Sequence, residues 1–194
     1  MKAFIFDLDG TLLDTLEDIG QACNAVLAAH GYPTHPLAAY RRMVGNGFGR
    51  LVRSALPPAA LQALTPEALT PLVDEARAWY GRHMREHTHP YAGMPEALTE
   101  LARRGLTLAV LSNKPDDFTR TLINHYFPQI PFAEVRGGRS DTPLKPDPAG
   151  PRAICRVGSG GRAVLLRGRQ RRGHAHGAQC GYGFRRCGLG LSRP

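Results

Sequence analysis

Apolar residues follow two different spacings along the chain, and this alternation predicts strands separated by helices. The run Phe4-Ile5-Phe6 is continuous, as in a buried strand, and so is the run over 106–111. Over 16–30 the apolar residues recur at helical spacing, and Gly31-Tyr32-Pro33 ends that helix. We expect helices over 16–30, 37–43, 48–56, 58–64, 66–84, 95–104 and 117–127, and strands over 4–6, 106–111 and 132–135.

Strands that alternate with helices favour an α/β fold with a parallel sheet and right-handed crossovers. No strand pattern interrupts the helices between 16 and 85, which indicates an inserted helical cap. We therefore predict a Rossmann-like core over 1–15 and 86–150 and an α-helical cap over 16–85. A compositionally foreign tail over 151–194 stands where the C-terminal strands of the sheet would be missing or aberrant.

The tail carries all of the excess positive charge. The formal net charge is +9, from 25 Lys and Arg against 16 Asp and Glu. Ten of the basic residues, all of them Arg, lie in 151–194, which holds no Lys, Asp or Glu, so that 1–150 has a net charge of −1. The body of the chain is thus an ordinary, slightly acidic globular unit whose charge does not point to a specific nucleic-acid partner.

Length and composition limit the remaining classes. A chain of 194 residues can hold one domain with a small insertion and can bury a real hydrophobic core. The N-terminal apolar run is too short for a signal peptide, and no apolar stretch could span a bilayer, so we expect a cytoplasmic protein without a membrane partner. The four cysteines show no C-x-x-C spacing, which argues against a structural zinc site or a disulfide framework.

The most specific chemistry lies where the first strand ends. Asp7 and Asp9 follow the apolar run two residues apart, and Gly10-Thr11 comes directly after them. Residues i and i+2 of a strand share a face, so both carboxylates could address one ligand, while Gly10 permits a sharp turn. Ligands of parallel sheets bind at the carboxyl ends of the strands, where the segments that follow 4–6, 106–111 and 132–135 would converge.

The string from Asp7 to Thr15 closely resembles the first motif of the haloacid dehalogenase superfamily, D-x-D-G-T followed by a further Asp and Thr. The resemblance implies that Asp7 is the nucleophile and Asp9 the general acid/base. It also implies that the Ser112 hydroxyl binds the transferring phosphoryl group, and that the Lys145 ammonium neutralises charge there. Mg²⁺ would be held by Asp7, the backbone carbonyl of Asp9 and an acidic residue of a fourth motif.

Three further segments look like phosphoglycolate phosphatases and their close relatives: Val44-Gly45-Asn46-Gly47, His89-Pro90-Tyr91-Ala92-Gly93 and Leu111-Ser112-Asn113-Lys114-Pro115. This narrower resemblance covers most of 1–150 and implies hydrolysis of a small phosphorylated metabolite through an aspartyl-phosphate. Thr11 and Asn113 would contribute to substrate binding. Asn46 and Arg50 are the cap residues expected to touch the organic part of the substrate, although Gly45-Asn46-Gly47 could equally be a plain interhelical turn.

The chain departs from the family after Asp147, because no acidic residue follows and the fourth motif, usually G-D-S-x-x-D, is missing. If the DNA encoding 166–182 is read from the second nucleotide of each codon, the permitted codons can spell Y-V-G-D-S-x-V-D-M-x-T-A-x-N-A-G-M. That string contains the missing motif and the helix after it, and the apolar run over 163–166 could still supply the strand before it. We therefore predict a frameshift between Pro148 and Leu166, an incomplete Mg²⁺ site, and little or no phosphatase activity.

Other interpretations stay open. Motif chemistry alone does not exclude a phosphomutase on the same scaffold. The Arg-Gly tail resembles disordered RNA-binding segments and would suit a non-catalytic protein, although only Tyr182 and Phe184 interleave its arginines. The stretch from His83 to His87 matches the letters H-x-x-E-H of a zinc protease class, but we expect a solvated helix end because no further acidic ligand helix is evident. Nothing in the sequence indicates the oligomeric state.

Overall fold

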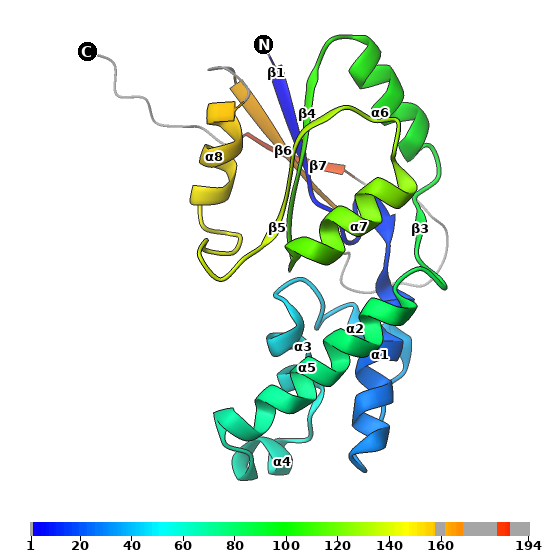
Figure 1. Cartoon of the computed structure of the whole chain (residues 1–194), viewed down its shortest axis with the longest axis vertical. Coiled ribbons are helices and arrows are strands. Elements are labelled where there is room, and N and C mark those ends of the chain that lie inside the picture. The colour runs from blue at the N-terminus through cyan, green and yellow to red at the C-terminus, as the bar shows by residue number, and fades with distance from the viewer. Residues whose placement is uncertain (1, 158–161, 169–181, 187–194) are drawn as a thin grey trace, which may run out of the picture.

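The computed structural model describes residues 2–157, 162–168 and 182–186 (Figure 1). Its centre is a five-stranded sheet with the strand order β5-β4-β1-β6-β7. The strands are β1 (Lys2–Phe6), β4 (Thr107–Pro115), β5 (Phe132–Gly138), β6 (Arg162–Gly168) and β7 (Tyr182–Arg186). Four of them run parallel, and β7 pairs antiparallel with β6. The expected α/β fold with a parallel sheet is confirmed.

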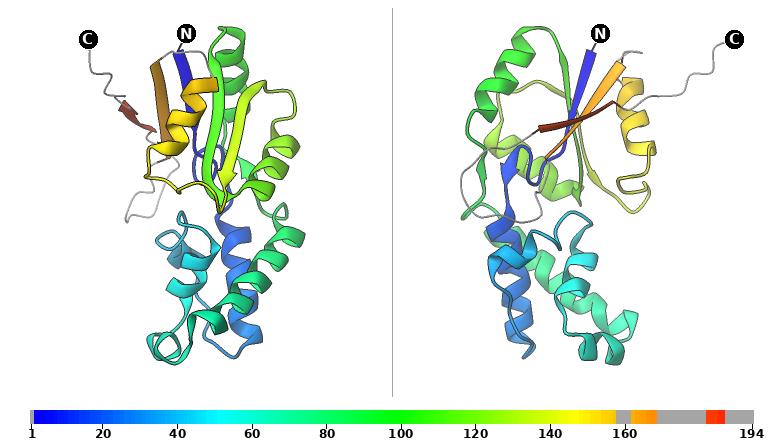
Figure 2. Two further views of the ribbon diagram at one scale, coloured as in Figure 1. Left: turned by 60° about the vertical axis from the view of Figure 1, so that its left-hand side comes forward. Right: turned by 180° about the vertical axis from the view of Figure 1, so that it is seen from behind.

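Helices cover both faces of this sheet. α6 (Met94–Arg103) and α7 (Asp116–Tyr126) lie on one face, and α8 (Ala149–Val157) lies on the other (Figure 2). Right-handed crossovers require this arrangement, because the chain moves outward from β1 through β4 to β5 and then returns to β6 beside β1.

Successive residues of β4 contribute to cores on opposite faces of the sheet, as the strand period of two requires. Leu108 and Val110 belong to the main core, whereas Ala109 and Leu111 pack with Ile154 of α8. The continuous apolar run over 106–111 therefore reflects a strand that is buried on both sides.

Five further helices form a separate group at the carboxyl ends of the parallel strands (Figure 1). They are α1 (Leu16–Ala29), α2 (Leu37–Tyr40), α3 (Phe48–Ala55), α4 (Pro58–Ala63) and α5 (Pro66–His83). We call them the helical lobe. α5 is its longest member and packs against α1 and α3, which buries Leu27, Leu51 and Ala76 between the helices.

The lobe is joined to the sheet by two chain crossings that are bound to each other. β2 (Leu13–Asp14) on the outgoing crossing pairs antiparallel with β3 (His89–Pro90) on the returning one. The buried Asp18 carboxylate accepts hydrogen bonds from the His87 and Thr88 backbone N–H groups, both at 2.9 Å. The lobe therefore meets the sheet through a braced joint rather than through two independent linkers.

Several element boundaries differ from the sequence-based expectations. The strand expected over 106–111 continues to Pro115, and the one expected over 132–135 continues to Gly138, because the two strands pair again at Pro115 and Gly138 after a register shift. α8 was not expected, and the helix expected over 37–43 ends at Tyr40.

The C-terminal expectations are only partly within the described residues. The apolar run over 163–166 lies in β6, as anticipated, and pairs with β1. Residues 158–161, 169–181 and 187–194 lie outside the described residues, and with them most of the segment that would encode the fourth motif and most of the Arg-Gly tail. In the described part of the chain, no helix is both long and apolar enough to cross a membrane.

Candidate active site

A tight loop after β1 carries the two aspartates. Gly10 adopts a left-handed conformation with φ of 72°, and its N–H donates to the Leu13 carbonyl at 2.9 Å. Leu8, Leu12 and Leu13 are fully buried and anchor the loop in the core. The side chains of Asp7 and Asp9 remain 14% and 13% exposed. The loop thus presents two carboxylates to the carboxyl ends of the strands from a rigid base.

Asp7 and Lys145, which are far apart in the sequence, form an ion pair. The Lys145 Nζ lies 2.6 Å from the Asp7 Oδ1, and the same oxygen accepts a hydrogen bond from the Leu8 N–H at 2.9 Å. The Lys145 ammonium also donates to the Leu111 carbonyl at 2.7 Å, and its side chain is only 6% exposed. The structure therefore brings the expected nucleophile and the expected phosphate-neutralising cation together.

Asn113 is a clamp for the loop that carries Lys145. Its Oδ1 accepts from the Lys145 N–H at 2.8 Å, and its Nδ2 donates to the Lys145 carbonyl at 3.1 Å and the Gly45 carbonyl at 3.0 Å. The amide, which sequence reasoning had assigned to substrate binding, is engaged by main-chain groups of the sheet and the lobe. Neighbouring Ser112 is buried, and its Oγ accepts from the Lys114 N–H at 3.1 Å.

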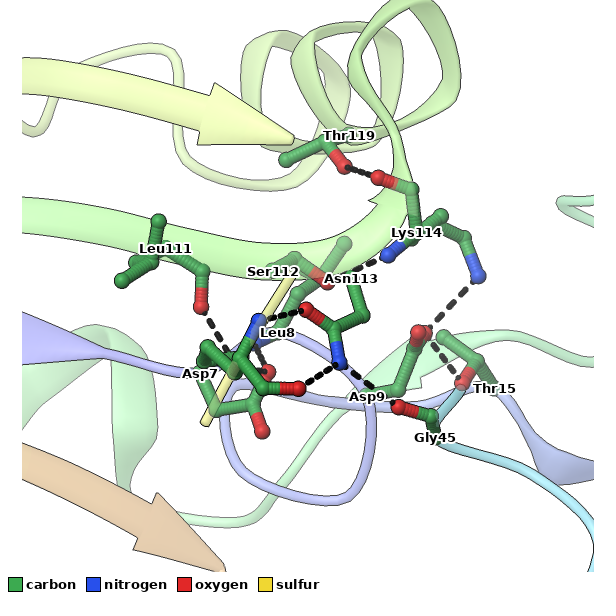
Figure 3. Close-up of polar contacts among 11 residues, drawn as sticks. Asp7, Leu8, Asp9, Thr15, Gly45, Leu111, Ser112, Asn113, Lys114 and Thr119 are labelled. Carbon is green, nitrogen blue, oxygen red and sulfur yellow. Dashed lines mark hydrogen bonds and ion pairs between the residues drawn. The ribbon is translucent and has the colours of Figure 1, made fainter. Parts of the chain in front are cut away.

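Lys114 is a site residue that sequence reasoning missed. Its Nζ donates to the Asp9 Oδ1 at 2.8 Å, and the Thr15 hydroxyl donates to the same oxygen at 2.7 Å (Figure 3). Burial alone would lower the pKa of the Lys114 ammonium, but the Asp9 carboxylate and Tyr80 outweigh that effect and raise the pKa. The available signal in the sequence was a lysine just after a buried apolar run, because a charge that is buried there requires a partner of opposite charge.

The two aspartates lie in the loop beyond β1 and not on the strand itself, from which the D-x-D spacing was interpreted. β1 ends at Phe6, and each aspartate beyond it is held by its own lysine. Lys145 and Lys114 come from different segments, so the aspartates and lysines form two separate pairs.

The remaining expected site residues lie at the periphery. Thr11 is buried in the loop, where its N–H donates to the Leu8 carbonyl at 3.2 Å. Asn46 is exposed and directly follows Gly45, whose carbonyl accepts from Asn113, so the chain brings it to the edge of the site. Arg50 is exposed in the first turn of α3. The Arg50 guanidinium forms no ion pair with a described residue.

The donor set fits Mg²⁺ only in part. Mg²⁺ prefers near-octahedral oxygen coordination, and Asp7 and Asp9 offer carboxylate and carbonyl oxygens. Among the described residues, no group of three or more His, Cys, Asp and Glu side chains could hold a metal ion. The sequence supplies no acidic residue beyond Asp147, so a third carboxylate ligand is not available from the tail.

The H-x-x-E-H stretch is not a metal site within the described structure. α5 ends at His83, whose Nδ1 lies 2.7 Å from the Glu86 Oε1, while the His87 Nδ1 lies 3.5 Å from the Glu17 Oε1. The two histidines thus pair with different glutamates, which agrees with the expected solvated helix end.

Comparisons with known proteins place the chain among phosphatases. Residues 4–157 match the family described as haloacid dehalogenase-like hydrolases. A phosphoglycolate phosphatase of Thiobacillus denitrificans is 31% identical over 166 residues, which cover 86% of this chain and 73% of that protein. One from Pseudomonas syringae pv. tomato is 37% identical over 150 residues, covering 76% of this chain and 54% of that protein. This chain therefore spans about half to three quarters of the length of these two relatives.

A solved structure agrees with these relatives. The crystal structure of a predicted phosphoglycolate phosphatase from Haemophilus somnus 129PT superposes with a TM-score of 0.70 at 28% identity. The match covers 80% of this chain and 70% of that one. The matched family segment, residues 4–157, contains the β1 loop, the end of β4 and the Lys145 loop, which together form the candidate site.

Proposed function

This chain belongs to the haloacid dehalogenase-like hydrolase family and is of the phosphoric monoester hydrolase type, and from that premise we propose that its site hydrolyses a small phosphate monoester such as phosphoglycolate through an aspartyl-phosphate on Asp7. The observation that carries this proposal is the pairing of Asp7 with Lys145 at 2.6 Å. An ammonium at this position would offset the charge of an approaching phosphate.

The proposed reaction has two steps on this chain's own residues. In the first, an Asp7 carboxylate oxygen forms a bond to phosphorus, the bond from phosphorus to the leaving alkoxide breaks, and Asp9 gives a proton to that alkoxide. In the second, Asp9 takes a proton from water, the water oxygen bonds to phosphorus, and the Asp7–phosphorus bond breaks. Phosphoryl transfer depends mainly on positioning and electrostatics, which Ser112 and Lys145 would supply.

Mg²⁺, when bound, would neutralise phosphoryl charge beside Asp7 and the Asp9 carbonyl. A divalent cation and a phosphate dianion neutralise each other, so both could enter the site beside the two ion pairs without changing its net charge. Because the third carboxylate ligand is missing, we propose that the polypeptide binds Mg²⁺ weakly and turns over slowly. Reading the DNA of the tail from the second nucleotide of each codon would restore the acidic fourth motif.

The proposed division of labour follows the proposed domains. Residues 1–15 and 86–150 form the catalytic core, and 16–85 form a cap that carries Asn46 and Arg50 to the organic part of the substrate. A guanidinium such as that of Arg50 suits a carboxylate, which phosphoglycolate would present. The proposed place of action is the cytoplasm, and the partner is the small phosphorylated metabolite alone.

Trapping of the covalent intermediate tests this proposal. The full chain and a frame-corrected chain are mixed with ³²P-labelled phosphoglycolate and Mg²⁺, quenched in acid, and assayed for protein-bound label that hydroxylamine releases. We expect label on the frame-corrected chain, little on the full chain as it stands, and none on either after Asp7→Asn. Asp14→Asn, which removes a carboxylate of the adjacent strand β2, is the matched control and should keep the label. Undiminished labelling of Asp7→Asn would contradict the assignment.

A further inference from the structure

The helical lobe rests on the sheet domain through an aromatic cluster formed by Phe48 of α3, Tyr80 of α5 and Phe118 of α7. The Tyr80 ring centroid lies 5.2 Å from that of Phe48 and 5.3 Å from that of Phe118, and the Phe48 and Phe118 centroids lie 6.2 Å apart. Gly81 permits this approach, because a Cβ there would stand 3.3 Å from the Phe118 ring. Two lobe helices thus meet one sheet helix at a single packed contact.

Lys114 lies between this cluster and the active-site loop. Its Nζ is 4.6 Å from the centroid of the Tyr80 ring and 2.8 Å from the Asp9 Oδ1. The backbone of Lys114 is fixed on both sides, since its N–H donates to Ser112 and its carbonyl accepts from the Thr119 hydroxyl at 3.2 Å. The side chain is only 2% exposed. The ammonium is therefore enclosed by a ring from the lobe and a carboxylate from the loop.

The free-energy cost of removing an ammonium from water must be offset by the groups that surround it. Asp9 supplies an opposite charge, and the face of Tyr80 supplies a cation–π contact that is strongest when water is excluded. The Tyr80 hydroxyl has no hydrogen-bond partner among the described residues, so the ring acts through its face and its packing. If the lobe moved away, water would replace the Tyr80 ring around the ammonium, and the hydrated ammonium would depend less on Asp9 for compensation.

We propose that Lys114 is a positioning residue that couples the seating of the helical lobe to the orientation of Asp9. With the lobe seated, Tyr80 keeps the ammonium on the Asp9 Oδ1, where Thr15 also donates. Both donors bind the same oxygen, so in the described structure the Asp9 Oδ2 has no donor and is available to exchange a proton with a leaving group. This inference rests on the proposed role of Asp9 as proton donor and acceptor.

Lysine acylation of the full chain tests the coupling without any need for turnover. Lys2, Lys114 and Lys145 are the only lysines of the sequence, so mass spectrometry can follow each one separately after treatment with an N-hydroxysuccinimide ester. Tyr80→Leu removes the ring, and Tyr80→Phe keeps it as the matched control. We expect Lys114 to react at least about tenfold faster in Tyr80→Leu and at the wild-type rate in Tyr80→Phe, with Lys145 unchanged in both.

Two results would overturn the coupling. Equal Lys114 rates in all three proteins would show that the ring does not hold the ammonium. Equal acceleration of Lys114 and Lys145 in Tyr80→Leu would show general loosening instead of a specific contact. If Tyr80→Leu does not fold, Tyr80→Met fills the space with an unbranched apolar chain and carries the same expectation.

Zero-length cross-linking reports the orientation of Asp9 itself. A carbodiimide joins a carboxylate and an amine in direct contact, so the wild-type chain should yield both Asp9–Lys114 and Asp7–Lys145 cross-links. We expect Tyr80→Leu to lower the ratio of the first to the second several-fold and Tyr80→Phe to leave it unchanged. An unchanged ratio in Tyr80→Leu would refute positioning by the lobe. If the cross-link ratios are as expected but no label is trapped on Asp7, the proposed chemistry is refuted and the positioning by the lobe is not.

Discussion

At the scale of single residues, one buried carboxylate holds the joint between lobe and sheet. Asp18 accepts the backbone N–H groups of His87 and Thr88 at 2.9 Å, and the Tyr126 hydroxyl donates to the Thr88 carbonyl at 2.6 Å. Asp18→Ala would leave two N–H groups without their acceptor, so we expect a loss of about 3 kcal/mol in the free energy of unfolding, measured in urea.

Two further variants make that expectation specific. Asp18→Asn keeps one acceptor oxygen and should lose about half as much stability as the alanine variant. Glu17→Ala removes the neighbouring carboxylate, which is 45% exposed, and should change stability by less than about 0.5 kcal/mol. Similar losses in the Glu17 and Asp18 variants would show that the joint does not depend on the buried acceptor.

The limits of sequence reasoning at this scale are visible in Asp9. The D-x-D-G-T motif led to both aspartates, and the resemblance to the family's third motif led to Lys145. Lys114 was not assigned, because its contact with Asp9 exists only once β4 continues past its apolar run to Pro115. The bonds of Asn113 to Gly45 and Lys145 were not anticipated, since they join segments whose proximity no local pattern reveals.

At the scale of elements, the end of β5 depends on a glycine. A Cβ on Gly137 would lie 2.4 Å from the Asp116 Cα, and that neighbour is backbone at the start of α7 and cannot rotate away. We expect Gly137→Ala to lower the free energy of unfolding by about 3 kcal/mol or more, seen as a lower Tm by circular dichroism. Gly49→Ala is the control, because nothing lies within 4 Å of its Cβ in α3 and it should be neutral or slightly stabilising. Equal Tm values for the two variants would contradict the steric argument.

The same junction should make stability depend on acid pH. Burial alone would raise the pKa of the Asp116 carboxyl, but Arg139, the Gly137 N–H and Arg120 outweigh it and lower the pKa from 3.8 to about 2. A folded-state pKa below the unfolded value stabilises the fold above about pH 4, and that contribution is lost as the pH falls toward 2. It amounts to about 2 kcal/mol at most and is reduced by salt.

Urea unfolding between pH 5 and pH 2 would measure this dependence. Asp116→Asn should make the free energy of unfolding depend less steeply on pH over this range. Asp117→Asn, which removes an exposed carboxylate of the same helical turn, should change that dependence less. If Asp116→Asn left the pH dependence of the free energy of unfolding unaltered, the Asp116 carboxyl would not contribute to it as its contacts imply.

The sequence predicted which helices and strands exist better than it predicted where they end. The long amphipathic helices α1 and α5 were expected within one residue of their observed ends. The β2–β3 ribbon has two residues per strand, too few for any periodicity to indicate it. α8 was missed because Pro148, Gly150 and Pro151 are typical of a loop, and only its packing against the sheet makes it a helix.

At the scale of the whole molecule, the described sheet and lobe bring together the proposed site residues, whereas the sequence after Asp147 turns into an Arg-rich tail without an acidic residue. The loss of a carboxylate ligand weakens the binding of a hard divalent cation. We expect half-saturation of phosphatase activity by Mg²⁺ to require at least about 100-fold more Mg²⁺ for this chain than for a frame-corrected chain, in a titration with phosphoglycolate.

The chain as it stands and the frame-corrected chain share residues 1–148, so a difference in their Mg²⁺ dependence reports the effect of the tail. Replacement of the restored acidic residues by asparagine or serine in the frame-corrected chain should return it to the weak Mg²⁺ response, which separates the loss of a ligand from the loss of folded structure. Circular dichroism of both chains provides the control for folding. Equal turnover and equal Mg²⁺ dependence of the two chains would mean that Asp7 and Asp9 suffice to hold the ion, and that the tail has no chemical consequence for the site.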